Sequence, residues 1–195
     1  MEVSITATSR ELDTAVASTR ETMRAIMLFL VFGLFADVYG AGLEDLVNAL
    51  NTTQAIWLYN RSYDVTVKGG NQKCVRWHLE SLTRSSYDFE NYYKVNEAYF
   101  GENGTHATLD AQGDKATLSV TYQSEGEVSY TLQKWDPSGK CFVLTRNTGN
   151  EGETKCELHL WQEKVTQGHS TSCDEEYKKL CDGEQKEVFT EHDCM

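Results

Sequence analysis

Hydrophobic and polar residues alternate along most of the chain beyond residue 55, and this two-residue period is the spacing of half-buried β-strands. Short polar links rich in glycine separate the alternating segments at nearly even intervals. The pattern predicts eight strands, at residues 56–67, 74–83, 89–99, 106–111, 115–122, 128–135, 141–147 and 155–163. The predicted links are residues 69–71, 101–104, 112–114, 125–126, 136–139 and 149–152.

Helical signals occur only at the two ends of this array. Apolar residues at positions 43, 46, 47 and 50 follow the spacing of a short amphipathic helix. Residues 172–175 have the form of a capping box and predict a helix over 173–181, followed by an extended piece at 185–189. Eight strands joined by tight turns favour an antiparallel meander, and closing it into a barrel removes both edges. We therefore expect an all-β fold, an eight-stranded antiparallel up-and-down barrel with a short N-terminal helix and a C-terminal side helix; a two-sheet sandwich is the alternative.

A different pattern occurs before this array. Twelve consecutive apolar residues, 25–36, follow Arg24 and precede Val38 and Gly40, which suit the positions before a cleaved bond. The run is too short to span a bilayer and is typical of a secretory signal peptide. A buried hydrophobic helix is the alternative interpretation.

The chain is therefore divided into three parts. Residues 23–40 are assigned to the signal peptide core and cleavage region, and residues 41–195 to one mature domain. Residues 1–22 are either an extended n-region or a segment upstream of a start at Met23. This division predicts a secreted, extracellular protein.

Composition narrows the classes of partner. The formal net charge is −12, which leaves no basic surface for a nucleic acid or for an anionic membrane. Hydrophobic residues make up 39% of the chain, enough to fill a core, so a disordered chain is not expected. The sequence thus favours an acidic globular domain that interacts with neither nucleic acid nor membrane.

Cysteines and sequons fit the secretory route. An even number of cysteines in an oxidising compartment predicts three disulfides, formed by Cys74, Cys141, Cys156, Cys173, Cys181 and Cys194. No closely spaced cysteine pair is present, so no metal site is expected. N-x-[S/T] sequons predict glycans on Asn51, Asn60 and Asn103.

Strand alternation indicates which side chains face the interior. If Asn60 carries a glycan, the even-numbered face of the first strand points outward, and the inward residues are Trp57, Tyr59, Arg61 and Tyr63. On the eighth strand, a disulfide from Cys156 to the C-terminal helix would place the even-numbered face beneath that helix. The inward residues of that strand are then Glu157, His159 and Trp161.

No catalytic pattern stands out. The sequence contains no G-x-S-x-G, H-E-x-x-H or P-loop motif. Glu157 and His159 share a strand face and could form an acid/base pair, but this spacing is common by chance. We expect neither an enzyme nor a cofactor.

Several segments together resemble the tick salivary lipocalins, the histamine-binding family, which includes a japanin-like group. The segments that carry the resemblance are 57–63 (WLYNRSY), 69–75 (GGNQKCV), 140–144 (KCFVL), 155–158 (KCEL) and the terminal Cys194. The resemblance covers the mature chain and implies a lipocalin barrel, secretion in saliva and sequestration of small host mediators that drive inflammation and immunity. It also implies the disulfides Cys74–Cys194, Cys141–Cys173 and Cys156–Cys181.

The resemblance implies three classes of ligand or partner. In the amine binders an acid stands at the position of Glu157 and a tyrosine at that of Tyr63, which suits histamine or serotonin through charge pairing and cation–π contact. The sequence departs from those members at residues 64–68, where the expected acid and aromatic residue are missing and Lys68 has the opposite charge. It departs again at 45–47, which lack a tryptophan. An inward Arg61 would suit an amphiphilic lipid such as a leukotriene or fatty acid, and the alternative for Arg61 is an ion pair with Glu157 or another inward acid. Cholesterol is a further lipid candidate. The alternative to sequestration is an immunomodulator that binds a host protein through its outer surface.

Overall fold

The computed structural model describes residues 41–147, 154–166, 171–181 and 185–195, so the predicted signal region and the predicted link at 149–152 lie outside the described residues. The helices are α2 (Leu43–Leu50), α3 (Gln162–Val165), α4 (Ser172–Leu180) and α5 (Glu191–Cys194). The strands are β1 (Ile56–Arg61), β2 (Thr66–Val67), β3 (Gly70–Asn71), β4 (Lys73–Leu82), β5 (Ser86–Val95), β6 (Ala98–Gln112), β7 (Lys115–Tyr122), β8 (Gly126–Asp136), β9 (Cys141–Arg146), β10 (Lys155–Trp161) and β11 (Lys186–Glu187).

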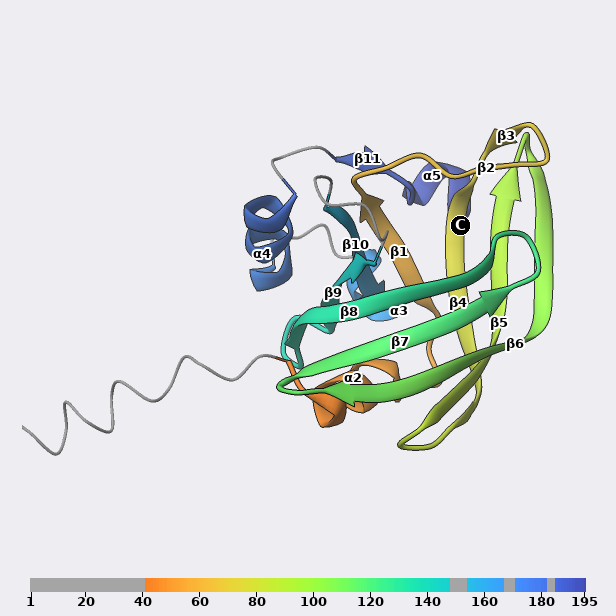
Figure 1. The fold of residues 1–195 in the computed structure, drawn as a ribbon. Coiled ribbons are helices and arrows are strands. Elements are labelled where there is room, and N and C mark those ends of the chain that lie inside the picture. Colours follow the sequence, from red (N-terminus) through yellow and green to blue (C-terminus); the bar gives the residue numbers. More distant parts are fainter. Residues whose placement is uncertain (1–40, 148–153, 167–170, 182–184) are drawn as a thin grey trace, which may run out of the picture. The chain divides into compact units, whose positions relative to one another are not determined.

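Eight strands form a closed antiparallel barrel, as the alternating pattern predicts (Figure 1). Each strand from β4 to β10 pairs with the next in sequence, and β1 closes the barrel by pairing with β4 on one side and β10 on the other. The β1–β4 pairing covers only Ile56 and Trp57. Farther along β1, the C-terminal strand β11 pairs with Asn60 and Arg61 instead. The last residues of the chain therefore complete the wall of the barrel.

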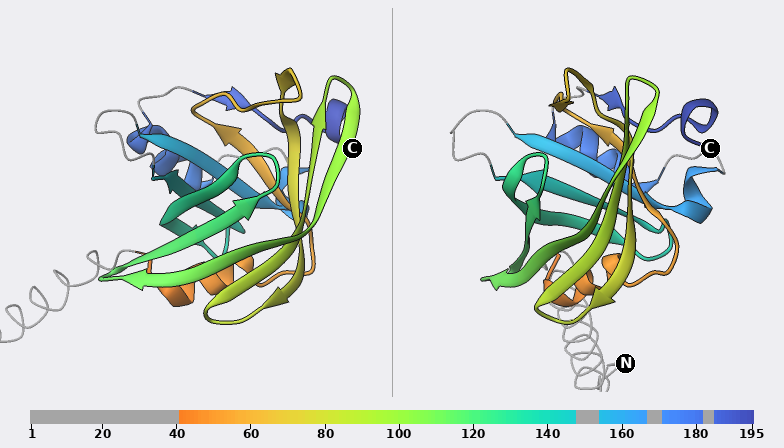
Figure 2. Two further views of the ribbon diagram at one scale, coloured as in Figure 1. Left: turned by 45° about the vertical axis from the view of Figure 1, so that its right-hand side comes forward. Right: turned by 90° about the vertical axis from the view of Figure 1, so that its right-hand side faces the viewer.

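The helices lie at the end and on the side of the barrel (Figure 2). The apolar face of α2 places Leu46, Ala49 and Leu50 fully buried against the interior core, so α2 closes one end. Helix α4 lies against the outside of β8, β9 and β10. In the part of the chain that the structure describes, no helix has the length and apolar character needed to cross a membrane.

Three local predictions are wrong. Residues 101–104 belong to β6 rather than to a link, and the β5–β6 turn is formed by Asn96 and Glu97, both with positive φ (48° and 67°). The glycine at the end of the predicted link, Gly104, has φ of 66° beside a register shift, which is the geometry of a β-bulge. The glycine that indicated a turn at this position therefore marks a bulge within a strand, and the local sequence does not distinguish the two.

The other two errors concern strand and helix ends. The first predicted strand stops at Arg61, and the end of its remainder forms β2. This strand pairs with β3 in a short hairpin, so residues 70–71 of the predicted link at 69–71 belong to a strand. The capping box of α4 begins one residue earlier than predicted, because Thr171 and Asp174 cap each other across the first turn. Both differences leave the barrel and the side helix as expected.

Candidate functional site

A β-bulge in β1 decides which of its side chains enter the barrel. The pairing with β10 shifts between Leu58 and Asn60, so Tyr59 is an extra residue that reverses the alternation. Arg61 and Tyr63 face the interior as predicted. The inward prediction for Trp57 and Tyr59 is wrong, because both rings lie on the outer side, within 4.9 and 6.1 Å of the Phe189 ring between ring centroids.

The eighth barrel strand, β10, keeps a regular alternation. Glu157 and His159 are buried inside the barrel, at 4% and 1% exposure. Trp161 packs with the interior core near the closed end, where its indole N–H donates to the carbonyl oxygen of Ala49 at 3.0 Å. The three residues predicted to point inward on this strand do so.

The centre of the site is the carboxylate of Glu157. The hydroxyl of Tyr63 donates a hydrogen bond to Glu157 Oε1, and His159 Nε2 lies 2.9 Å from Glu157 Oε2. The His159 ring is held between Phe142 and Trp77, with centroid distances of 4.9 and 4.6 Å. These contacts fix the carboxylate in an aromatic surrounding.

Glu157 stays ionised although it is buried. Burial opposes the charged form, but the hydrogen bond and charge of His159, the Tyr63 hydroxyl and the positive charge of Arg61 outweigh it and lower the pKa of Glu157. The buried carboxylate is thus stabilised by Tyr63, by His159 and by the more distant positive charge of Arg61. No lysine or arginine of the described residues contacts it directly.

Arg61 forms hydrogen bonds with Gln72, which lies in the connection between β1 and β4. Its guanidinium donates from Nη1 to Gln72 Oε1 at 3.2 Å and from Nη2 to the Gln72 carbonyl oxygen at 2.5 Å. Burial lowers the pKa of Arg61, and the charge of Glu157 raises it in part. Arg61 therefore balances the interior charge from a distance while staying bound to Gln72.

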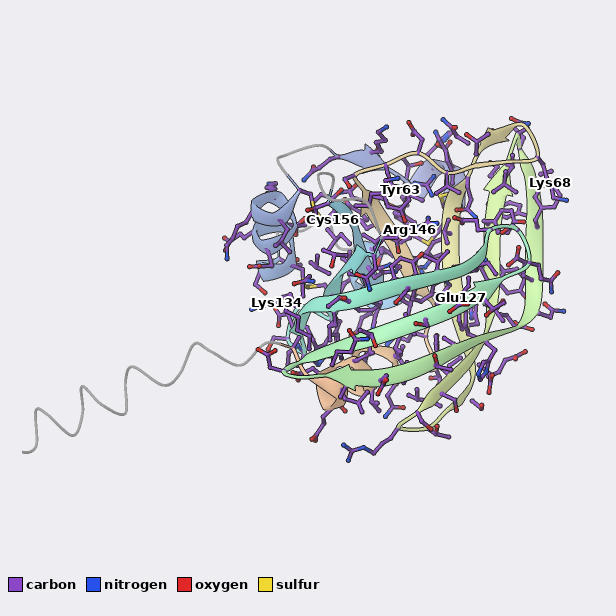
Figure 3. The ribbon with its side chains drawn as sticks, viewed as in Figure 1. Tyr63, Lys68, Glu127, Lys134, Arg146 and Cys156 are labelled. Carbon is purple, nitrogen blue, oxygen red and sulfur yellow. A yellow bond between two sulfur atoms is a disulfide. The ribbon has the colours of Figure 1, made fainter. Side chains whose placement is uncertain are left out.

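Cations surround the ring of Tyr63 at the open end of the barrel, where Figure 3 shows Tyr63 and Arg146 near one another. The charged groups of Arg146 and Lys155 each lie 5.5 Å from the ring centroid, and that of Arg61 lies 5.9 Å from it. Arg146 also pairs with Glu125 at 3.0 Å. Burial and then the charge of Glu157 raise the pKa of Tyr63, so its hydroxyl remains a donor.

Two neighbouring cavities lie in this region, and Tyr63 lines the outer one. An open pocket of about 480 Å³ at the mouth is lined by Tyr63, Asp64, Val65, Thr66, Glu125, Glu127, Val128, Ser129, Arg146, Asn147 and Lys155. An inner cavity of about 20 Å³ is lined by Leu58, Arg61, Val65, Gln72, Val75, Trp77, Asn91, Tyr122, Glu125, Tyr130 and Glu157. The walls of both include Val65 and Glu125, so the two cavities are neighbours.

Several residues of the site were not predicted from the sequence. Tyr122 and Tyr130 are buried beside Glu157, and burial followed by the charge of Glu157 raises the pKa of Tyr130. Asn91 lies on the buried face of β5, between Phe89 and Tyr93. A polar residue that interrupts an apolar stripe was the one available signal for Asn91.

The structure also places the cysteines and sequons. It forms the disulfides Cys74–Cys194, Cys141–Cys173 and Cys156–Cys181, the pairing that the resemblance implies. Asn51 and Asn103 are exposed. Asn60 points to the outer side but is only 8% exposed, and it pairs with Glu187 of β11. Within the described ranges, no group of three or more histidine, cysteine or acidic side chains could hold a metal ion.

Comparisons with known proteins identify a family and a similar fold. Residues 41–195 match the family model described as tick histamine binding protein. A structure of japanin from Rhipicephalus appendiculatus bound to cholesterol is similar in fold, with a TM-score of 0.52 and 14% identity over 74% of this chain and 97% of that chain. A comparison with curated protein sequences gave no match.

Proposed function

Because the chain belongs to the tick histamine-binding protein family, we propose that it is a secreted salivary lipocalin that sequesters a small host mediator, and that this mediator is a biogenic amine. It acts by stoichiometric binding, without catalysis, to suppress inflammation and immunity in the host. Three disulfides suit the extracellular compartment. Residues 23–40 would direct secretion, and residues 41–195 would form the binding domain.

The observation that carries this proposal is the ionised, buried carboxylate of Glu157. A charge removed from water is costly unless a partner of opposite sign compensates it. The direct partners of Glu157 are Tyr63 and His159, neither of which is a permanent cation. A ligand ammonium group can add a permanent positive charge in direct contact with this carboxylate, and the aromatic rings around the site favour a cation further.

The size and lining of the mouth pocket also favour a small amine. The mouth pocket, at about 480 Å³, lies in the usual range for small-ligand sites. Its lining includes Asp64, Glu125 and Glu127 against Arg146 and Lys155, so acidic groups are in excess. In this binding mode Tyr63 turns away from Glu157, the two cavities join, and the ammonium group replaces the tyrosine hydroxyl.

A sterol or another amphiphilic lipid fits this interior less well. The space deeper in the barrel is filled by large side chains that are at most 2% exposed, including Trp77, Tyr87, Phe89 and Phe142. The inner cavity measures about 20 Å³, close to the space of one water molecule. Binding a sterol there would require several of these rings to leave their packed positions, which costs several kcal/mol.

A competition experiment tests the proposal. The full chain would be secreted from eukaryotic cells, purified from the medium and offered histamine, serotonin, leukotriene and cholesterol together, with bound mass measured by native mass spectrometry. We expect one amine to be retained. In calorimetry, Glu157→Gln should weaken amine binding by about 2 kcal/mol or more, roughly thirtyfold in Kd, because it removes the buried charge.

The matched control is Glu127→Gln, which neutralises an exposed carboxylate of the mouth pocket. It should change Kd by about twofold at most, since exposed charges are well screened. Retention of leukotriene or cholesterol instead of an amine, or an unchanged Kd in Glu157→Gln, would contradict the proposal. If the chain suppressed inflammation without retaining any of these ligands, a host protein bound at the outer surface would be favoured.

A further inference from the structure

Three buried polar atoms around the inner cavity have no hydrogen-bond partner among the described residues. They are Arg61 Nε, Trp77 Nε1 and Asn91 Oδ1. Their residues are 3%, 2% and 1% exposed, so bulk water does not reach them. All three residues line the cavity of about 20 Å³ that Glu157 also lines.

Such atoms are costly when they remain unsatisfied, because burial removes their hydrogen bonds to water without replacing them. Barrel interiors that only pack side chains generally avoid this arrangement, because the large majority of buried side-chain polar atoms have a hydrogen-bond partner. The three atoms come from three different strands or their ends, β1, β4 and β5. The residues that carry these atoms line one cavity together with Glu157, and this indicates a place for a polar group from outside the chain.

The hydrogen-bonding character of the three atoms restricts that group. Arg61 Nε and Trp77 Nε1 are N–H donors, whereas Asn91 Oδ1 is an acceptor. A hydroxyl oxygen has two lone pairs for the donors and one O–H for the acceptor. A carboxylate would leave Asn91 without a donor and would lie beside the negative charge of Glu157. A second ammonium group would be repelled by the positive charge of Arg61.

We propose that the inner cavity is a hydroxyl subsite, formed by Arg61, Trp77 and Asn91, that selects amines bearing a hydroxyl group. This inference rests on the proposed function and narrows its ligand class. The ammonium group of the ligand pairs with Glu157, and the ligand hydroxyl enters the cavity, which has room for about one water-sized group. An amine without a hydroxyl leaves the two N–H donors and Asn91 unpaired or bound to a water.

Matched ligand pairs test the subsite. Tyramine and phenethylamine differ by one hydroxyl, as do serotonin and tryptamine, and calorimetry would give the Kd ratio within each pair. For the wild-type chain we expect the hydroxylated member of at least one pair to bind about tenfold more tightly. Asn91→Leu and Trp77→Phe should each bring that ratio close to one, because each removes one hydrogen-bonding atom while keeping much of the side-chain volume.

Glu157→Gln serves as the contrasting variant. It should weaken both members of a pair and leave their ratio unchanged, since it acts on the shared ammonium group. Thermal unfolding would check that each variant is folded. A wild-type measurement covers the case in which Asn91→Leu and Trp77→Phe do not fold: the indole N–H resonance of Trp77 in ¹H–¹⁵N spectra should shift with tyramine and not with phenethylamine.

The outcomes separate the subsite from the function. Equal binding of both members of each pair, with Glu157→Gln still weakening both, would overturn the hydroxyl subsite and leave amine sequestration standing. A ratio that persists in both Asn91→Leu and Trp77→Phe would also overturn the subsite, because the hydroxyl would be bound elsewhere. If no amine binds, the proposed function and the subsite fall together.

Discussion

Replacing Tyr63 by phenylalanine tests whether the hydroxyl of this residue stabilises the buried charge. Tyr63→Phe keeps the ring and its contacts with the surrounding cations but removes the O–H that donates to Glu157 Oε1. A hydrogen bond to a charged group contributes about 1.5–3 kcal/mol. Because Glu157 is buried and ionised, we expect the free energy of unfolding at pH 7 to fall by roughly that amount.

The same change should alter the pH dependence of stability. The pKa of Glu157 is lowered in the folded state, so its ionisation stabilises the fold above the unfolded-state pKa, and this stability is lost as pH falls through the folded-state value. Without the tyrosine hydroxyl the folded-state pKa rises. At acid pH, where Glu157 is protonated in the folded and unfolded states alike, wild type and variant should therefore differ less than at pH 7.

Urea unfolding followed by tryptophan fluorescence at several pH values would measure both effects. The control is Tyr99→Phe, whose hydroxyl bonds the carbonyl oxygen of Asp193 at 3.3 Å on a residue that is 53% exposed. That variant should change stability by about 0.5 kcal/mol or less. A Tyr63→Phe variant as stable as Tyr99→Phe at pH 7, with the pH profile of the wild type, would refute a stabilising role of the Tyr63–Glu157 bond.

Two further predictions concern the disulfides and the glycans. Changing Cys74 and Cys194 to alanine opens a loop with a sequence separation of 120, for which chain entropy predicts a contribution of roughly 5 kcal/mol. Urea unfolding should therefore show that the free energy of unfolding falls by about 2–5 kcal/mol, and hydrogen exchange should rise first in residues 185–195. Full protection of these residues would contradict the role of this bond in holding the C-terminal strand. In secreted protein, Asn103→Gln should remove one glycan mass. Asn60→Gln should leave the mass of attached glycan unchanged, because the Asn60 residue is only 8% exposed; a glycan found on Asn60 would show that this side chain is not buried in the secreted protein.

The barrel as a whole was predictable because its signals are local. The strand Lys115–Tyr122 has the predicted bounds, since alternation of side chains across a strand is a property of the extended backbone itself. The same holds for the helix around Leu46, whose apolar spacing is visible within eight residues. Burial of Glu157 and His159 followed from one further step, the disulfide of Cys156, because β10 has a regular alternation.

The binding site depended on features that only the closed barrel determines. One extra residue, Tyr59, reverses the alternation in β1, and nothing in the local sequence marks it, because a bulge arises from the pairing of two strands distant in sequence. The Arg61–Gln72 hydrogen bonds and the meeting of Trp77 with Asn91 at one cavity likewise require the barrel to close. The sequence by itself determined the strands, the cysteines and the acidic charge, because these follow from short-range sterics and composition. The tertiary structure decided which polar groups share the buried interior, because that depends on the register of every strand pair around the closed sheet.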